Sequence, residues 1–316
     1  MGFDKSDYLL NVLETHKMKH IDSLFDKFKE RRKEIKEKLE EKFGDDIYSP
    51  FNSGSYAKHT AVNAKFDLDI VAPCKRNSFS TITGMFDDFF DFLQSEYKEI
   101  AYVRKQKVSI GVEFFADEDN DIVQIDVVPG RELKQGDYPN DNYLNININV
   151  YGSNYTQTNI HAQIDNIKGK SDARQIIRLL KIWKYQNYKD YKSFFIELIV
   201  IKAFENKIVS GNLWSKLKVV LEYIIDEIEG DNFSLKDPGN SSNDIAKTID
   251  SYKKTLLKND FKFLLEQVEL NDENLKNHFK ENEKYKIVEE SSESKSGYRI
   301  NDSSKAIIPP SNQFGL

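Results

Sequence analysis

Hydrophobic positions in the first part of the chain recur at helical spacing. In residues 8–43 apolar side chains return every three or four residues, with lysine and glutamate between them, which is the pattern of an amphipathic helix. We therefore expect one long helix over residues 8–43, ending at Gly44. Its most charged part, residues 27–42, suits either a coiled-coil arm or a solvated helix face, and we favour the solvated face.

The middle of the chain has the pattern of a sheet with one helix. Residues 66–72 alternate into a β-branched run that ends at Pro73, and three later segments have the short alternation typical of strands. The predicted elements are strands at 66–72, 102–108, 110–115 and 122–128, the last three in meander order, and a helix at 79–97. The asparagine-rich residues 140–155 are expected to form a loop or linker.

After residue 165 the hydrophobic spacing becomes helical again. The predicted helices are residues 172–187, 193–208, 213–229 and one or two within 244–267. Asp-Pro-Gly-Asn at 237–240 predicts a turn, and residues 289–305, rich in Ser, Glu and Lys, are expected to be disordered. The fold class is therefore α+β. We expect a sheet domain at 1–155 that includes the long helix, a helical domain at 156–288 and a flexible tail at 289–316.

Composition narrows the classes of function. The formal net charge is −6 and the pI about 5.6, whereas proteins that bind duplexes regardless of sequence are normally basic. We therefore expect no obligatory nucleic acid. Cys74 is the single cysteine, which fits a reducing compartment. The sequence shows neither an apolar run long enough to cross a membrane nor a secretory signal, so we expect a cytoplasmic protein without a membrane partner.

Three carboxylates interrupt apolar strand patterns. Asp67 and Asp69 are two residues apart, so on a strand their side chains share one face and repel each other unless a cation lies between them. Asp126 lies in another apolar strand, where an unpaired buried carboxylate is unfavourable. For each residue alone, a solvated edge position explains the sequence equally well. The three together favour a catalytic site that holds Mg²⁺.

A glycine–serine pair precedes these carboxylates. Gly54 permits close backbone approach, and the backbone amides and the Ser55 hydroxyl can hold a phosphate. The 12-residue gap to Asp67 leaves room for a short helix. Lys58 and Thr60 are near enough to assist, but we favour the interpretation that both are ordinary surface residues.

The helical half adds basic and aromatic candidates. A basic stripe at helical spacing consists of Arg174, Arg178, Lys181 and Lys184. Such a stripe is more often a solvated helix face than a binding site, and we favour the former here. Residues 192–194 open the next helix, where backbone amides favour phosphate. Phe194 suits either stacking on a base or a place in the core.

In chain order these motifs resemble the cGAS/DncV-like nucleotidyltransferases (CD-NTases) of bacterial CBASS anti-phage systems. This family belongs to the polymerase-β-like superfamily, as do the oligoadenylate synthetases. The matching segments are GSYAKHTAV (54–62), DLDI (67–70), IDVVP (125–129), IRLLKIWK (177–184), KSFFIEL (192–198) and DPGNSSNDIA (237–246). The resemblance extends from the first helix to about Leu265. His59 and Gly239 depart from the family pattern, which leaves the nucleotide preference open.

The resemblance implies a fold and a site. The fold would be a polymerase-β-like nucleotidyltransferase sheet domain plus an oligoadenylate-synthetase-like helical domain, with the long first helix spanning both. The implied catalytic and metal residues are Asp67, Asp69 and Asp126, and the implied nucleotide-binding residues are Gly54, Ser55, Lys181, Ser193 and Phe194. Two Mg²⁺ ions, replaceable by Mn²⁺, would serve catalysis.

The resemblance also implies an activity and partners. The chain would be a monomer that joins NTPs, ATP among them, into a cyclic di- or trinucleotide second messenger, and its tail, residues 303–316, would reach a CBASS accessory protein. Simple fraying of the tail is the alternative. Three other functions stay open: a non-cyclising transferase that makes linear oligonucleotides or modifies RNA or protein, an inactive binding module, and a nucleic-acid-activated sensor.

Overall fold

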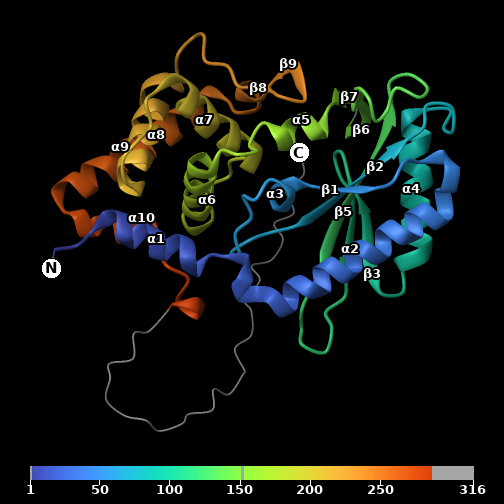
Figure 1. Ribbon diagram of the computed structural model, residues 1–316, viewed down its shortest axis with the longest axis horizontal. Helices are drawn as coiled ribbons and strands as arrows, with labels where there is room; N and C mark the ends of the chain where they lie inside the picture. The colour runs from blue at the N-terminus through green and yellow to red at the C-terminus, as the bar shows by residue number, and fades with distance from the viewer. Residues whose placement is uncertain (1, 151–152, 287–316) are drawn as a thin grey trace, which may run out of the picture.

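The computed structural model describes residues 2–150 and 153–286 (Figure 1). The helices are α1 (Lys5–Thr15), α2 (Asp22–Phe43), α3 (Gly54–Ala57), α4 (Ile82–Tyr97), α5 (Ile160–Asp165), α6 (Ser171–Gln186), α7 (Ser193–Asn206), α8 (Leu213–Glu227), α9 (Ser251–Leu270) and α10 (Leu275–His278). The strands are β1 (Phe51–Ser53), β2 (Leu68–Cys74), β3 (Ala101–Lys105), β4 (Ile110–Phe114), β5 (Gln124–Glu132), β6 (Leu144–Val150), β7 (Ser153–Thr158), β8 (Lys236–Asp237) and β9 (Asn240–Asp244). Single 3₁₀ turns lie at Met18–Ile21, Gly44–Asp46, Ile245–Thr248, Asp272–Asn274 and Glu283–Tyr285. The predicted mixture of a sheet with helices is confirmed.

The sheet has seven strands in the path β1-β2-β5-β4-β3, and β6 and β7 continue from β5. Strands β2 and β5 are parallel, and the other pairs are antiparallel. The meander β3-β4-β5 agrees with the predicted order. The strand predicted at residues 66–72, before Pro73, has shifted ends. It is β2, which begins at Leu68 and continues through Pro73 to Cys74.

The helix predicted over residues 8–43 is two helices. Lys17 is extended (φ −69°, ψ 145°) and separates α1 from the 3₁₀ turn before α2. The break is held from the loop before β2, since Asn63 donates its backbone N–H to the His16 carbonyl (3.0 Å). Its side-chain amide donates to the carbonyls of Thr15 (3.0 Å) and Lys17 (3.1 Å). Spacing alone missed the break because both segments are amphipathic.

The two helices serve different cores. Leu9 and Val12 of α1 belong to the core of the helical half, whereas Ile35 and Leu39 of α2 belong to the core under the sheet. All four are fully buried. Figure 1 shows α1 beside the helices α6–α10, and α2 running along the sheet. The break therefore lets one amphipathic segment turn toward two separate cores.

The loop predicted at residues 140–155 is wrong. Residues 144–150 and 153–158 form β6 and β7, an antiparallel pair that extends the sheet from β5. Leu144 and Ile146 are 1% and 4% exposed, and the asparagines between and after them, Asn145 and Asn147, are buried as well. The alternation of aliphatic and amide residues is a strand pattern, which the asparagine content concealed.

The helical half agrees with its predicted elements, with shifted ends. The turn predicted at 237–240 joins β8 to β9, and the helix predicted within 244–267 begins only at Ser251, as α9, after a 3₁₀ turn. Residues 289–305 and the tail at 289–316 lie outside the described residues. Within the described part of the chain, no helix is both long and apolar enough to cross a membrane.

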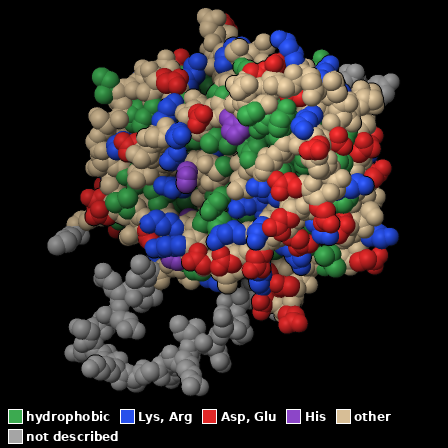
Figure 2. Space-filling view, turned by 45° about the vertical axis from the view of Figure 1, so that its right-hand side comes forward, with side chains coloured by type: hydrophobic (Ala, Val, Ile, Leu, Met, Phe, Trp, Pro, Cys, Tyr) green, Lys and Arg blue, Asp and Glu red, His purple; other side chains and the backbone are tan. Residues whose placement is uncertain are grey.

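The outer surface of α2 is a solvated face. Figure 2 shows acidic and basic side chains interspersed in a band along the lower part of the molecule, where α2 runs. Several of these charges pair with each other along the helix, as Arg31 does with Glu34 at 2.7 Å. This agrees with the interpretation favoured for residues 27–42.

Candidate functional site

The three carboxylates singled out in the sequence lie together. Asp69 on β2 and Asp126 on β5 are register partners of two adjacent parallel strands, and Asp67 lies one residue before β2. One carboxylate oxygen from each of the three residues lies within 4.8 Å of the other two. Leu68, between the first two, is fully buried, as expected for alternation along a strand. The parallel pairing of β2 and β5 thus builds the cluster.

Burial and mutual repulsion act on these groups. Burial of the Asp69 carboxylate, together with the charges of Asp67 and Asp126, raises its pKa to about 8. Burial also raises the pKa of Asp126 to about 6. The side-chain amides of Gln106 and Gln124 donate to Asp126 Oδ1, at 3.1 and 3.3 Å, and so orient this carboxylate. The cluster is unfavourable without a cation.

The donor set fits a hard divalent cation. All the clustered ligand atoms are carboxylate oxygens, which Mg²⁺ and Mn²⁺ accept and which zinc sites rarely use alone. The described residues hold a second acidic cluster, Asp117, Asp119 and Asp121. There the ammonium of Lys27 lies 2.6–2.7 Å from each of the three carboxylates. The negative charge of this second cluster is therefore balanced by a side chain of the protein itself.

Gly54 is required beside the cluster. It follows β1, opens the short helix α3 and has φ +70°, a left-handed conformation that favours glycine. A Cβ at this position would lie 1.6 Å from Asp69 Oδ2. The predicted turn into a short helix is confirmed, and Ser55 follows directly and lines the same cleft as Asp69.

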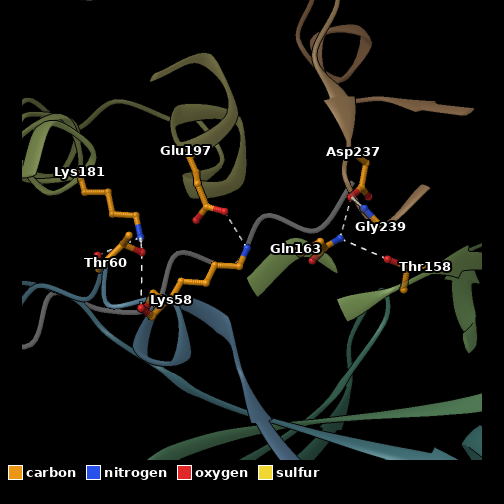
Figure 3. Close-up of polar contacts among 9 residues, drawn as sticks. Lys58, Thr60, Thr158, Gln163, Lys181, Glu197, Asp237 and Gly239 are labelled. Carbon is orange, nitrogen blue, oxygen red and sulfur yellow. Dashed lines mark hydrogen bonds and ion pairs between the residues drawn. The ribbon is translucent and has the colours of Figure 1, made fainter. Parts of the chain in front are cut away.

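Lys58 and Thr60 are buried, so the surface interpretation favoured for them is wrong. Lys58 is 7% exposed and Thr60 is fully buried. Lys58 Nζ lies 2.9 Å from Glu197 Oε1 on α7 and 4.6 Å from the centre of the Phe194 ring. Figure 3 shows Lys58 reaching from α3 to Glu197 across the space between the two halves. A sequence without coordinates gives no signal for this pairing, because 139 residues separate the partners.

The basic stripe on α6 is only partly a solvated face. Lys181 is 3% exposed, and its ammonium donates to the Thr60 carbonyl (3.1 Å) and hydroxyl (2.9 Å). Lys184 is 8% exposed and donates to Ser193 Oγ (3.1 Å). Burial lowers the pKa of both lysines to about 8. Two of the four basic residues therefore face inward rather than to solvent, which corrects the favoured interpretation.

Most of these groups, but not Lys184, line one cleft of about 500 Å³ between the sheet and the helical half. The sequence-predicted residues on its wall are Gly54, Ser55, Asp67, Asp69, Lys181, Ser193 and Phe194. Asp126 does not line the cleft, but its carboxylate lies within 4.8 Å of those of Asp67 and Asp69, which do. Phe194 lines the cleft, is partly buried and packs against the helical core, so the structure supports the core alternative, and stacking on a base stays a prediction.

Another part of the cleft wall is a network that sequence reasoning missed. Asp237 of β8 accepts from the Gly239 N–H (2.8 Å) and from Gln163 Nε2 of α5 (2.9 Å). The same amide nitrogen donates to Thr158 Oγ1 at 3.2 Å (Figure 3). The Asp-Pro-Gly motif was the available signal, but it indicated only a turn. The network attaches the β8–β9 hairpin to β7 and α5.

Both departures from the family pattern have a local explanation. His59 has φ +57°, so it occupies a backbone conformation for which glycine is the default residue. Gly239 lies where a Cβ would be 2.6 Å from the Asn159 carbonyl oxygen. Neither residue contacts the carboxylate cluster.

No protein-family model matches the chain. Among curated proteins the chain is similar to the cyclic AMP-AMP-AMP synthase of Escherichia coli (strain MS 115-1), with 26% identity over 218 residues. That match covers 63% of this chain and 65% of the synthase, so it spans just under two thirds of the relative's length.

Solved structures have the same fold. E. coli MS115-1 CdnC with ATP superposes with a TM-score of 0.60 at 21% identity, covering 77% of this chain and 85% of that one. The CD-NTase CdnG of Bradyrhizobium diazoefficiens, in complex with GTP, superposes with a TM-score of 0.69 at 15% identity, covering 87% and 96%. The predicted resemblance to the cGAS/DncV-like nucleotidyltransferases is confirmed.

The contact between Gly54 and Asp69 predicts a substitution effect. We expect Mg²⁺ to raise the melting temperature of the unmodified chain, and Gly54→Ala to remove that rise, because the new methyl group would displace the Asp69 carboxylate. A cation at ten times its dissociation constant stabilises a protein by about 1.4 kcal/mol, roughly 2 °C or more in a melting experiment. Differential scanning fluorimetry with and without Mg²⁺ measures this rise.

Gly136→Ala is the matched control. Gly136 also has a positive φ (+78°), but a Cβ there would meet nothing within 4 Å. Both alanine variants therefore have a strained backbone, and only Gly54→Ala has a clash with a carboxylate. An Mg²⁺-dependent rise that survives in Gly54→Ala would contradict the assignment.

Proposed function

We propose that this chain is a metal-dependent nucleotidyltransferase that joins NTPs into a cyclic di- or trinucleotide second messenger for anti-phage signalling. The observation that carries the proposal is the convergence of Asp67, Asp69 and Asp126 at one end of a cleft whose other wall carries buried lysines. An acidic floor facing basic side chains suits a metal-bound triphosphate. The similarity to a cyclic AMP-AMP-AMP synthase supports the same activity.

In the proposed reaction a ribose hydroxyl of one nucleotide attacks the α-phosphorus of another. A new P–O bond forms, and pyrophosphate leaves. Asp67, Asp69 and Asp126 would hold two Mg²⁺ ions, which Mn²⁺ can replace. When bound, these ions neutralise the triphosphate and activate the acceptor hydroxyl. The chain itself fixes the carboxylates through the β2–β5 register and orients Asp126 through Gln106 and Gln124.

The triphosphate would lie between Gly54 and α6. The close backbone approach at Gly54 and the adjacent Ser55 hydroxyl suit phosphate oxygens. Lys181 and Ser193 would bind the triphosphate from the helical side, with Lys184 holding the Ser193 hydroxyl in place. Phe194 would offer a ring face to the base. Holding both reactants in one cleft supplies much of the acceleration by alignment.

The proposal includes the organisation and partners of the chain. The sheet domain at 1–155 and the helical domain at 156–288 would hold the cleft between them, with residues 289–316 as the tail. ATP is a proposed substrate, because CdnC was solved with ATP. An accessory protein is a proposed partner, because CdnC was also solved in complex with HORMA-deltaN, at a TM-score of 0.60 and 22% identity to this chain. We place the enzyme in the cytoplasm as a monomer that needs neither nucleic acid nor membrane.

The activity is tested by incubating the chain with all four NTPs and Mg²⁺. The unmodified chain should release pyrophosphate and yield products that resist phosphatase, because a cyclic product has no terminal phosphate. Asp67→Asn combined with Asp69→Asn should lower pyrophosphate release by about a thousandfold or more, the range for losing preorganised charge stabilisation. Coupled pyrophosphate detection and mass spectrometry measure both.

The second acidic cluster provides the control. Asp117→Asn combined with Asp119→Asn changes the same residue type at the same spacing but affects only contacts with Lys27 and within residues 117–121, so turnover should persist. Full turnover in the Asp67 and Asp69 double variant contradicts the proposal. Products that phosphatase degrades completely would favour the linear transferase instead.

The buried lysines predict a pH dependence. Because the pKa of Lys181 is lowered to about 8, its ammonium is charged below that pH and loses its charge above it. We therefore expect kcat/KM for NTP to fall as the pH rises above about 8. Lys181→Arg, whose side chain stays charged, should move this decline to higher pH. Lys168→Arg, at an exposed position, is the control. Because the pKa of Lys184 is also lowered to about 8, the comparison is made in a Lys184→Arg background, where a decline that Lys181→Arg leaves in place would contradict the role given to Lys181.

A further inference from the structure

The loop between β3 and β4 places a glutamine amide behind the third carboxylate. Gln106 begins this loop, and its side-chain Nε2 donates to Asp126 Oδ1 at 3.1 Å. An ionised carboxylate can only accept hydrogen bonds, so the amide nitrogen faces Asp126 and the amide oxygen faces away from it. There the buried Ser109 hydroxyl donates to Gln106 Oε1 at 3.0 Å. Both ends of the Gln106 amide are therefore held by the protein.

Gly111 of β4 leaves room for this amide. It is the register partner of Asp126 on one side of β5, and Asp69 of β2 is the register partner on the other side. A Cβ on Gly111 would lie 2.4 Å from Gln106 Nε2 and 3.4 Å from Asp126 Oδ1. Oδ1 thus lies close to β4, where the glutamine reaches it.

The two oxygens of Asp126 differ in what they can still bind. Gln124, two residues earlier on the same face of β5, also donates its Nε2 to Oδ1, at 3.3 Å. A carboxylate oxygen has two lone pairs, and the two amides use both of those on Oδ1. Among residues 2–150 and 153–286, no hydrogen bond reaches Oδ2. The open ligand atom of Asp126 is therefore Oδ2.

We propose that Gln106, fixed by Ser109, is a positioning residue that closes Oδ1 of Asp126 and leaves Oδ2 alone for the divalent cation. The proposal rests on the proposed function, which needs this cation. Groups that hold a metal ligand from behind set its orientation, and their loss costs about ten- to a hundredfold in metal affinity or activity. Gln106 acts on the cation only through Asp126.

Equilibrium binding of Mn²⁺ tests the proposal without turnover. The affinity is measured by electron paramagnetic resonance in the absence of nucleotide, and the binding that is lost in Asp126→Ala is assigned to this site. Gln106→Met keeps the length of the side chain and removes the donor, so the affinity should fall by about tenfold or more. Ser109→Ala keeps the donor but frees the amide, and should give a smaller loss. Gln157→Met, on a strand that does not pair with β5, should leave the affinity unchanged.

Gly111→Ala separates positioning from folding. Its φ is not positive, and the atom that the new methyl group would meet most closely is the flexible end of Gln106, so the chain should stay folded while the amide is displaced. We expect a loss of Mn²⁺ affinity like that in Gln106→Met, with an unchanged circular dichroism spectrum. Unchanged affinity in both variants, or no Mn²⁺ binding that depends on Asp126, would overturn the proposal. The expected affinities without any pyrophosphate release from NTPs would contradict the proposed function alone.

Discussion

Mutual repulsion of three carboxylates at the ends of two neighbouring interior strands is the constraint on which the rest of this structure depends. Asp69 and Asp126 face each other across the parallel β2–β5 pair, and Asp67 joins them within 4.8 Å. Burial and like charge make this arrangement unfavourable by itself, as the raised pKa of Asp69 shows. The surrounding fold nevertheless holds the three carboxylates together through several independent contacts. Gly54 leaves room for one carboxylate, and two glutamine amides orient another. Strain that is held in this way at a cleft is characteristic of functional sites.

The cleft exists because the chain builds two cores and connects them through polar contacts. The break between α1 and α2 allows one segment to serve both cores, and Asn63 ties that break to the loop that leads to Asp67. Lys58 and Lys181 cross between the halves, to Glu197 and Thr60. These same lysines line the cleft in which we propose the phosphate site. The contacts that hold the halves together thus also supply charge to the cleft.

Local chemistry was readable in the sequence, whereas long-range pairing was not. Asp67, Asp69 and Asp126 were identifiable because carboxylates in apolar strands need a partner, and Gly54 because glycine marks close backbone approach. The burial of Lys58 and Thr60 was missed because their partners lie on other elements far along the chain. The β6–β7 pair was missed because the many asparagines suggested a loop, although aliphatic residues alternate with them at the period of two that is typical of a strand. The helix break was missed because its cause, Asn63, lies outside the helix. The roles of the nucleotide-binding residues and the domain boundaries stay predictions.

The central claim, that the three carboxylates bind divalent cations opposite a triphosphate, is tested most directly by anomalous diffraction. Crystals of the chain with Mn²⁺ and a non-hydrolysable ATP analogue would show where the metal lies. The account predicts anomalous peaks within about 2.6 Å of carboxylate oxygens of Asp67, Asp69 and Asp126, with the analogue's phosphates between the metal and Lys181. Bound analogue without a peak at these residues, or peaks only at Asp117, Asp119 and Asp121, would contradict it.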